Sequence, residues 1–149
     1  IHSNRLPAEL QDKVIVTEPF LLCAHKDNPI LQRKAPALAD FSAQRFIFFS
    51  RHVSPVYYEI LLSMCISAGF FPKAVDETRH WLSILSMVSQ NMGVSLVPAC
   101  MQHCGLPDLQ FLEFAHTQRS ITSVIWSRKK QDPIVSHAIE RIIAYYDAT

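Results

Sequence analysis

The chain has 149 residues, of which 49% are hydrophobic, and its 14 basic residues nearly balance its 13 acidic residues. A chain of this size can bury a sizeable core, and one domain or two small lobes are expected. The composition excludes a disordered protein, and no apolar run approaches the roughly 18 residues of a membrane span. Because the net charge is close to zero, the chain has no basic surface for a phosphate backbone, so any DNA-binding part is expected to lie elsewhere.

The cysteines and the beginning of the chain indicate a cytoplasmic protein. Cys23, Cys65, Cys100 and Cys104 lie mostly in apolar patterns, which is typical of buried thiols in a reducing compartment rather than of a disulfide framework. No signal peptide opens the sequence. The chain begins without a methionine, and we expect it to be a fragment of a longer protein.

The first third of the chain predicts short strands separated by turns. Two apolar runs, 14–16 and 20–24, predict strands that are separated by a break at Pro19. Asp27-Asn28-Pro29 is a turn signal. The next buried strand is predicted over residues 46–49.

A helix follows that strand. Ser54 and Pro55 supply an N-cap and a proline at the first helical position. Apolar residues then continue at helical spacing to Gly69, which can end the helix in the left-handed conformation. The residues after this glycine contain Ala74-Val75, which we interpret as a third strand.

The most informative stretch is a second helix with the strand after it. Trp81, Leu85, Val88 and Met92 recur at helical spacing, and Gly93 is expected to end the helix in the left-handed conformation. Residues 94–97 then form a strand that ends at Pro98. Residues 46–98 therefore predict an alternating βαβαβ core, which implies an α/β fold with a parallel sheet.

The last third predicts a short helix over residues 99–104, strands over 109–114 and 121–126, and a C-terminal helix. Asp132 and Pro133 repeat the arrangement of a cap followed by proline. The C-terminal helix carries an apolar stripe made of Val135, Ala138, Ile139, Ile142 and Tyr146.

Polar residues follow three of the predicted strands at their carboxyl ends, where open α/β sheets bind ligands. Two arginines, hydroxyl groups and helix N-termini at one edge suit a small carboxylate, because a guanidinium group can bind a carboxylate with two hydrogen bonds. The competing interpretation is that Ser54 only caps a helix and that both arginines are solvated. The candidate ligand-binding residues are Ser50, Arg51, His52, Ser54, Thr78, Arg79, Pro98 and Ala99.

Two other kinds of site are weaker alternatives. Cys100, His103 and Cys104 place three metal-capable side chains on one short helix, but a fourth partner is lacking, so we interpret the cysteines as core thiols and expect no metal site. Glu77 and His80 could form an acid/base pair, and Ser54 lies near His52, but neither pair has a supporting motif. With only three glycines there is no phosphate-binding loop, and we expect neither a cofactor nor an enzyme.

Taken together, these segments resemble the C-terminal effector-binding half of LysR-type transcriptional regulators, from about Leu10 to Tyr146. Each feature alone is weak, and the set is specific. The features that carry the resemblance are Glu18-Pro19-Phe20, the turn 27–30, the loop 49–55, Ala68-Gly69-Phe70 and the segment 82–98.

This resemblance implies a type 2 periplasmic-binding-protein-like fold, with two α/β lobes and a small-molecule cleft between them. Residues 25–115 would form a complete lobe II, and residues 1–24 and 116–149 would form part of lobe I. DNA would be bound only by an N-terminal helix-turn-helix absent from this chain. The loop 50–55 and the sequence Ala144-Tyr145-Tyr146 suggest the branch that senses aromatic-degradation intermediates.

We therefore expect the effector-sensing domain of a bacterial transcriptional regulator, which binds a small carboxylate and modulates transcription by the full-length protein. The alternative is a solute-binding protein of the same fold, and an enzyme is a third possibility. The apolar stripe of the C-terminal helix should pack on the missing part of lobe I. If it is left exposed, it should drive the formation of oligomers.

Overall fold

The computed structural model describes residues 7–73, 75–128 and 132–147. The chain forms two compact units, one made of Ile1–Glu18 with Arg119–Thr149 and the other made of Pro19–Gln118. We call them unit 1 and unit 2 and describe each by itself. Among the described residues, no helix is both long and apolar enough to cross a membrane.

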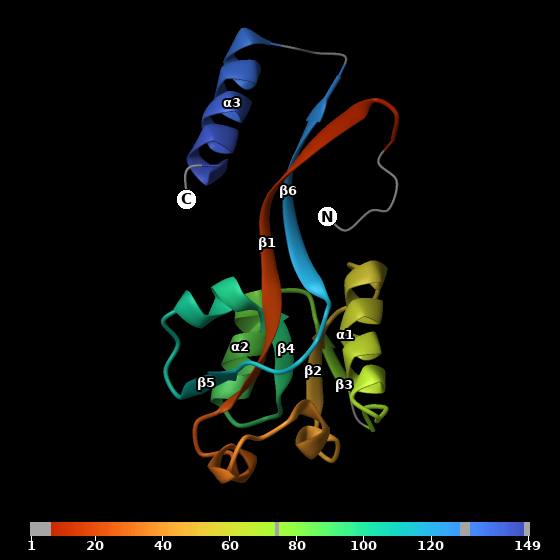
Figure 1. Ribbon diagram of the computed structural model, residues 1–149, viewed down its shortest axis with the longest axis vertical. Coiled ribbons are helices and arrows are strands. Elements are labelled where there is room, and N and C mark those ends of the chain that lie inside the picture. The colour runs from red at the N-terminus through yellow and green to blue at the C-terminus, as the bar shows by residue number, and fades with distance from the viewer. Residues whose placement is uncertain (1–6, 74, 129–131, 148–149) are drawn as a thin grey trace. The chain divides into compact units, whose positions relative to one another are not determined.

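Unit 2 is built on antiparallel and parallel strand pairs. The long strand β1 (Leu10–His25) enters the unit and pairs antiparallel with β4 (Ser95–Pro98) and with β5 (Leu109–Leu112) (Figure 1). Strand β2 (Phe46–Phe49) pairs parallel with β3 (Val75–Thr78). Ala74, which we expected in the same strand as Val75, lies outside the described residues.

The break expected at Pro19 is wrong, because β1 runs through it without interruption. The ladder with β4 begins one residue later, at Phe20 opposite Pro98. Pro19 is exposed and lies outside this register, so the missing N–H of the proline costs no hydrogen bond to β4.

The parallel sheet is smaller than the sequence predicted. Strand β4 meets β2 at a single parallel bridge, between Phe46 and Val94, and makes its full ladder with β1 instead. The side chain of Ser95 adds a second link, because its hydroxyl donates to the carbonyl oxygen of Ile47 at 2.6 Å. The pattern of apolar runs could not reveal that β1 would pair with the other edge of β4.

Alternate residues of β2 face two hydrophobic clusters, as the period of a strand requires. Phe46 and Phe48 pack in a cluster with side chains of α1 (Pro55–Ser67), whereas Ile47 packs in a second cluster with side chains of α2 (Trp81–Ser89). The two helices therefore cover opposite faces of β2 (Figure 1).

The helix ends show one confirmed prediction and one error. Gly69 has φ +89°, and the N–H of Phe70 donates to the carbonyl oxygen of Cys65, so α1 closes as expected. In α2 the left-handed residue is Asn91, with φ +57°, and the helix ends at Ser89 rather than near Met92. Gly93 is instead required by packing, because a Cβ atom there would lie 2.6 Å from the carbonyl oxygen of Arg45.

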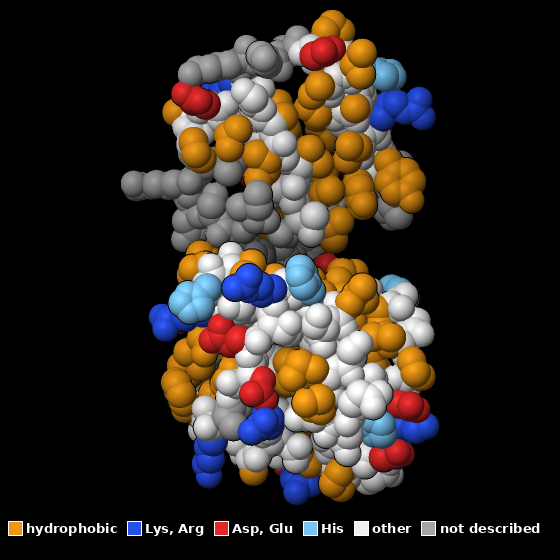
Figure 2. Space-filling view, turned by 180° about the vertical axis from the view of Figure 1, so that it is seen from behind, with side chains coloured by type: hydrophobic (Ala, Val, Ile, Leu, Met, Phe, Trp, Pro, Cys, Tyr) orange, Lys and Arg blue, Asp and Glu red, His pale blue; other side chains and the backbone are white. Residues whose placement is uncertain are grey.

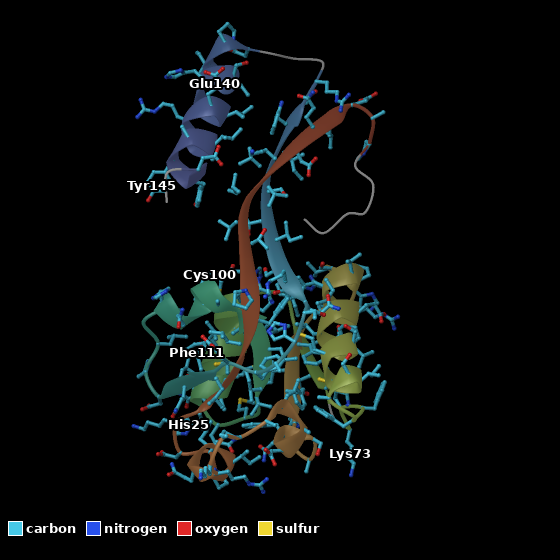
Figure 3. The ribbon with its side chains drawn as sticks, in the orientation of Figure 1. His25, Lys73, Cys100, Phe111, Glu140 and Tyr145 are labelled. Atoms are coloured by element: carbon cyan, nitrogen blue, oxygen red, sulfur yellow. The ribbon has the colours of Figure 1, made fainter. Side chains whose placement is uncertain are left out.

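Among its described residues, unit 2 also has three short 3-10 helices: η1 (Pro29–Gln32), η2 (Leu38–Phe41) and η3 (Ala99–His103). Cys23 and Cys65 are buried, as expected of core thiols. Cys100 on η3 (Figure 3) is exposed and Cys104 is half-buried, so the prediction that all four cysteines are core thiols is wrong for Cys100. The reason is that no residue of η3 is buried.

Unit 1 contains the first part of β1, β6 (Arg119–Ser127) and α3 (Pro133–Asp147). Strand β6 pairs with β1. Asp132 begins α3 as predicted, because its Oδ1 accepts a hydrogen bond from the N–H of Ile134 at 2.9 Å. No residue of α3 is buried, and hydrophobic side chains gather on this helix (Figure 2).

Candidate functional site

Strands β2 and β3 end at the same edge of unit 2. Their parallel register places Phe49 opposite Thr78. One residue further, the N–H of Ser50 donates to the carbonyl oxygen of Thr78 at 2.8 Å. The structure thus brings together two of the three predicted binding segments, the loop 50–54 and Thr78-Arg79. We call this region the strand-end edge.

The loop 50–54 leads directly into α1. The N–H groups of Val53 and Ser54 both donate to the carbonyl oxygen of Ser50, which turns the chain into the helix. Ser54 is the N-cap residue, but its hydroxyl accepts no hydrogen bond from the first turn. The positive end of the α1 dipole therefore lies at this edge without a side-chain cap.

The third predicted segment, Pro98-Ala99, follows β4. Pro98 is buried and precedes η3, a 3-10 helix of five residues. Because β4 meets β2 in a parallel bridge, Pro98 lies at the carboxyl end of a strand that runs in the same direction. Within the described residues, no hydrogen bond joins Pro98 or Ala99 to the loop 50–54.

Arg51 is already engaged by neighbouring groups. Its Nη2 lies 2.6 Å from Oε1 of Glu59, and its guanidinium lies 5.6 Å from the centre of the Tyr58 ring. Its backbone N–H donates to Oε2 of Glu77 at 2.9 Å. Burial, followed by the charge of Glu77, raises the pKa of Tyr58. A ligand anion at Arg51 would therefore have to compete with two carboxylates.

Arg79 differs from Arg51. It is exposed, and its side chain makes no hydrogen bond or ion pair with the residues that the structure describes. His52 is likewise exposed. A guanidinium group keeps its charge at all relevant pH values. Among the described residues, Arg79 is therefore the arginine of this edge that is available to an incoming anion.

Three aromatic rings lie directly behind the strand-end edge. The ring of Trp81, at the start of α2, lies 4.9 Å from that of Phe49 and 5.1 Å from that of Tyr57, in the first turn of α1. Sequence reasoning missed this cluster. The available signal was that an aromatic residue lies within four positions of each arginine, at Phe49 before Arg51 and at Trp81 after Arg79.

The alternative sites gain no support from the geometry. Within the described residues, no group of three His, Cys, Asp or Glu side chains could hold a metal ion. The carboxylate of Glu77 accepts a hydrogen bond from the backbone N–H of Arg51. Among the described residues, no hydrogen bond joins Glu77 to His80. The acid/base pair that the sequence left possible is therefore not formed by these two side chains.

The strand-end edge combines an available cation, an uncapped helix N-terminus and an aromatic wall. This set of groups can bind an anion with an apolar body. Groups of this kind at the carboxyl ends of strands are typical of the places where open α/β sheets bind ligands.

Residues 1–147 match the family described as LysR substrate binding domain. The chain belongs to this family of LysR substrate-binding domains. It is 28% identical over 142 residues to the HTH-type transcriptional regulator BudR of Raoultella terrigena, covering 91% of this chain and 49% of BudR. The chain thus spans about half the length of the curated relatives it matches.

Solved structures confirm the type 2 periplasmic-binding-protein-like fold. The BenM effector-binding domain with its effector benzoate superposes with a TM-score of 0.74 at 18% identity, covering 99% of this chain and 69% of that chain. The effector-binding domain of QuiR in complex with shikimate gives a TM-score of 0.74 at 12% identity, covering 94% and 66%. At these identities the likeness establishes the fold alone.

Proposed function

We propose that this domain binds a small carboxylate at the strand-end edge, and that binding modulates DNA binding and transcription by the full-length regulator. The ligand would contact the loop 50–54, Thr78-Arg79 and Pro98-Ala99. The observation that carries the proposal is the 2.8 Å hydrogen bond between Ser50 and Thr78, which joins the two arginine-bearing segments at the N-terminus of α1.

Each group has a separate role in this proposal. Arg79 supplies the charge for the carboxylate, because no described residue neutralises it. The α1 N-terminus supplies a favourable dipole. Trp81 and Phe49 form the wall for an apolar body. Benzoate and shikimate, which the BenM and QuiR domains hold in solved structures, are both carboxylates built on a six-membered ring.

Arg51 would have a smaller role than its position in the sequence suggested. Its exposed ion pair with Glu59 is of a kind that contributes about 0–1 kcal/mol. A ligand carboxylate can therefore displace Glu59 from Arg51 at low cost, but the new ion pair with Arg51 would contribute equally little to the binding free energy. Glu77 disfavours an anionic ligand at Arg51, because its carboxylate is negatively charged and already accepts the hydrogen bond of the Arg51 backbone N–H. We therefore place the main charge contact at Arg79.

The remaining expectations concern the whole protein. Its relatives are HTH-type transcriptional regulators about twice as long as this chain, which supports DNA binding by a segment outside it rather than a secreted solute-binding protein. We further propose that the whole protein acts in the cytoplasm as a homo-oligomer. Residues 25–115 would form lobe II, and residues 1–24 and 116–149 part of lobe I. The exposed side chains of Ile142 and Tyr146 on α3 would be covered in that assembly.

Calorimetric titration of the domain with benzoate tests the proposed site. We expect Arg79→Ala to weaken binding by roughly tenfold to a hundredfold, the range of a charge-assisted hydrogen bond. Arg45→Ala is the matched control, because Arg45 precedes β2 at the opposite end of the strand and pairs with Asp76 at 3.1 Å. Equal affinities in the parent and in both variants would exclude Arg79 from the site.

A further inference from the structure

The strand-end edge carries two arginines that lie on neighbouring strand ends. Phe49 lies opposite Thr78 in the parallel register, and the N–H of Ser50 donates to the carbonyl oxygen of Thr78 at 2.8 Å. Arg51 and Arg79 each follow this hydrogen bond by one residue, and neighbouring strands lie about 4.8 Å apart. Two carboxylates on one small ring can therefore reach both segments, so the charges around each arginine decide which class of ligand binds.

Glu77 supplies a negative charge to the Arg51 segment. Val75 packs against the hydrophobic cluster that contains side chains of α1. Glu77, two positions later in β3, lies on the same face because side chains alternate along a strand. From there its Oε2 accepts a hydrogen bond from the backbone N–H of Arg51 at 2.9 Å. The carboxylate of Glu77 thus lies at the loop that leads into α1.

The net charges around the two arginines have opposite signs. Nη2 of Arg51 lies 2.6 Å from Oε1 of Glu59. The single positive charge of Arg51 therefore faces two carboxylates, those of Glu59 and Glu77, and the group is negative overall. Arg79 is exposed, and no described residue neutralises it. A first carboxylate is attracted to Arg79, whereas a second carboxylate directed towards Arg51 meets a net negative charge.

We propose that Glu77 is a specificity-determining residue, which makes the strand-end edge a site for monocarboxylates and excludes dicarboxylates. This inference rests on the carboxylate site proposed above and defines its ligand class more narrowly. A ligand with one carboxylate binds Arg79 through that group and leaves the hydrogen bond between Glu77 and Arg51 in place. A ligand with two carboxylates has to displace Glu77 or lie against it, and the like charges repel each other.

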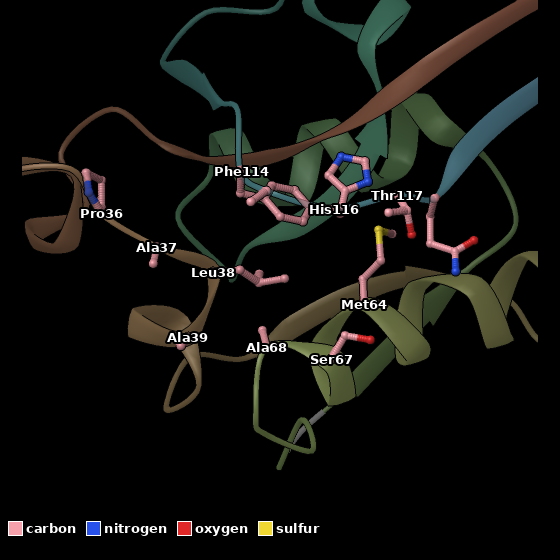
Figure 4. A pocket seen from close by; sticks show the side chains of 12 residues that line it. Pro36, Ala37, Leu38, Ala39, Met64, Ser67, Ala68, Phe114, His116 and Thr117 are labelled. Carbon is pink, nitrogen blue, oxygen red and sulfur yellow. The ribbon is translucent and has the colours of Figure 1, made fainter.

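A pocket in unit 2 is a second place where an aromatic ring could bind. It has a volume of about 560 Å³ and is lined by residues 36–39, residues 64–68 in part and residues 114–118 (Figure 4). No Lys, Arg, Asp or Glu is among its lining residues. The pocket therefore has no permanent charge with which to distinguish one carboxylate from two. Benzamide, a neutral analogue of benzoate, reports on binding of the ring alone.

Calorimetric titration with benzoate and with isophthalate, which adds a second carboxylate to the same ring, tests the role of Glu77. At about pH 8 carboxylates are ionised and histidines are mostly neutral. We expect isophthalate to bind the parent roughly tenfold more weakly than benzoate, because like charges a few ångströms apart repel near a protein surface. Glu77→Gln keeps an oxygen that can accept the Arg51 N–H and removes the charge. In this variant the affinity for isophthalate should lie within about threefold of that for benzoate.

Asp76→Asn is the matched control for the loss of one negative charge. Asp76 precedes Glu77 in β3, so its side chain points to the other face of the strand, and it pairs with Arg45 at 3.1 Å. Isophthalate should bind this variant as weakly as it binds the parent. Added salt should narrow the difference between the two ligands in the parent, since exposed charges are screened. The affinity for benzamide should be the same in the parent and in both variants.

The outcomes separate this inference from the proposed carboxylate site. Equal affinities of the parent for benzoate and isophthalate would overturn the role of Glu77, and so would a ratio of the two affinities that is unchanged in Glu77→Gln. Either result leaves the carboxylate site in place as long as Arg79→Ala still weakens benzoate binding. If Arg79→Ala binds benzoate as the parent does, or if the parent binds no benzoate, the site itself is wrong and the inference about Glu77 is wrong with it.

Discussion

Gly93 and Arg45 approach each other so closely that a side chain on the glycine has no room. A Cβ atom on Gly93 would lie 2.6 Å from the carbonyl oxygen of Arg45 and 3.3 Å from Cδ1 of Ile47. The contact is maintained by a hydrogen bond, because the N–H of Val94 donates to the same carbonyl oxygen at 2.9 Å. The start of β4 is thereby fixed against the start of β2.

Gly93→Ala is therefore expected to destabilise the domain by about 1–3 kcal/mol, the usual cost of forcing a group into a packed site. Chemical denaturation followed by circular dichroism measures the change. Gly69→Ala provides a comparison, since a Cβ atom there meets nothing within 4 Å and the cost arises only from the φ of +89°. An unchanged stability of Gly93→Ala would show that β2 and β4 are not this close.

Ser95 provides the second link between these strands. Its hydroxyl is fully buried and donates to the carbonyl oxygen of Ile47 at 2.6 Å. Ser95→Ala should cost about 1–2 kcal/mol, because the carbonyl group loses a buried partner. The control is Ser86→Ala on the exposed side of α2, for which we expect a change within about 0.5 kcal/mol. Equal denaturation midpoints for the two variants would contradict the role of Ser95.

The buried thiols should make the stability of the domain fall at alkaline pH. Burial raises the pKa of Cys23 and of Cys65 from 9.0 to about 12. The native state thus retains protons that the unfolded chain loses above pH 9.0, so stability declines as the pH rises from 9.0 toward 12. Denaturation of Cys65→Ala should show a shallower decline over this range. A decline in stability as steep as that of the parent would contradict the contribution of the buried Cys65 thiol.

Thiol accessibility gives a second test of the same burial. Iodoacetamide at about pH 8 should modify the exposed Cys100 first, because alkylation requires an accessible thiolate. Cys23 and Cys65 should react only after unfolding in denaturant, which mass spectrometry of proteolytic fragments can follow. Rapid native-state modification of Cys65 would be inconsistent with the packing of α1 described above.

The sequence predicted the ends of α1 well, because the residues that begin and end this helix lie next to it in the chain. Ser54, Pro55 and Gly69 bound α1 within one or two residues of the observed helix, since caps and left-handed glycines depend on their immediate neighbours. The end of α2 was misplaced because both Asn91 and Gly93 can end a helix. Only the contact with Arg45, 48 positions earlier in the chain, decides between them.

The sequence also placed part of the candidate site, because that part depends on local patterns. The positions of the loop 50–54 and of Thr78-Arg79 follow from strand ends, which local patterns reveal. The difference between Arg51 and Arg79 does not, because it depends on which carboxylates the fold brings to each arginine. Glu59, 8 positions later, pairs with the Arg51 guanidinium, and Glu77, 26 positions later, accepts its backbone N–H.

The most direct test of the central claim is to map benzoate binding on the domain by ¹H–¹⁵N NMR. We predict saturable shifts at the loop 50–54, at residues 78–81 and at Ala99, with the Trp81 indole among the most strongly affected signals. The same titration of Arg79→Ala should require a much higher benzoate concentration. Saturable shifts located elsewhere in the domain, with Arg79→Ala behaving as the parent, would contradict a carboxylate site at the strand-end edge.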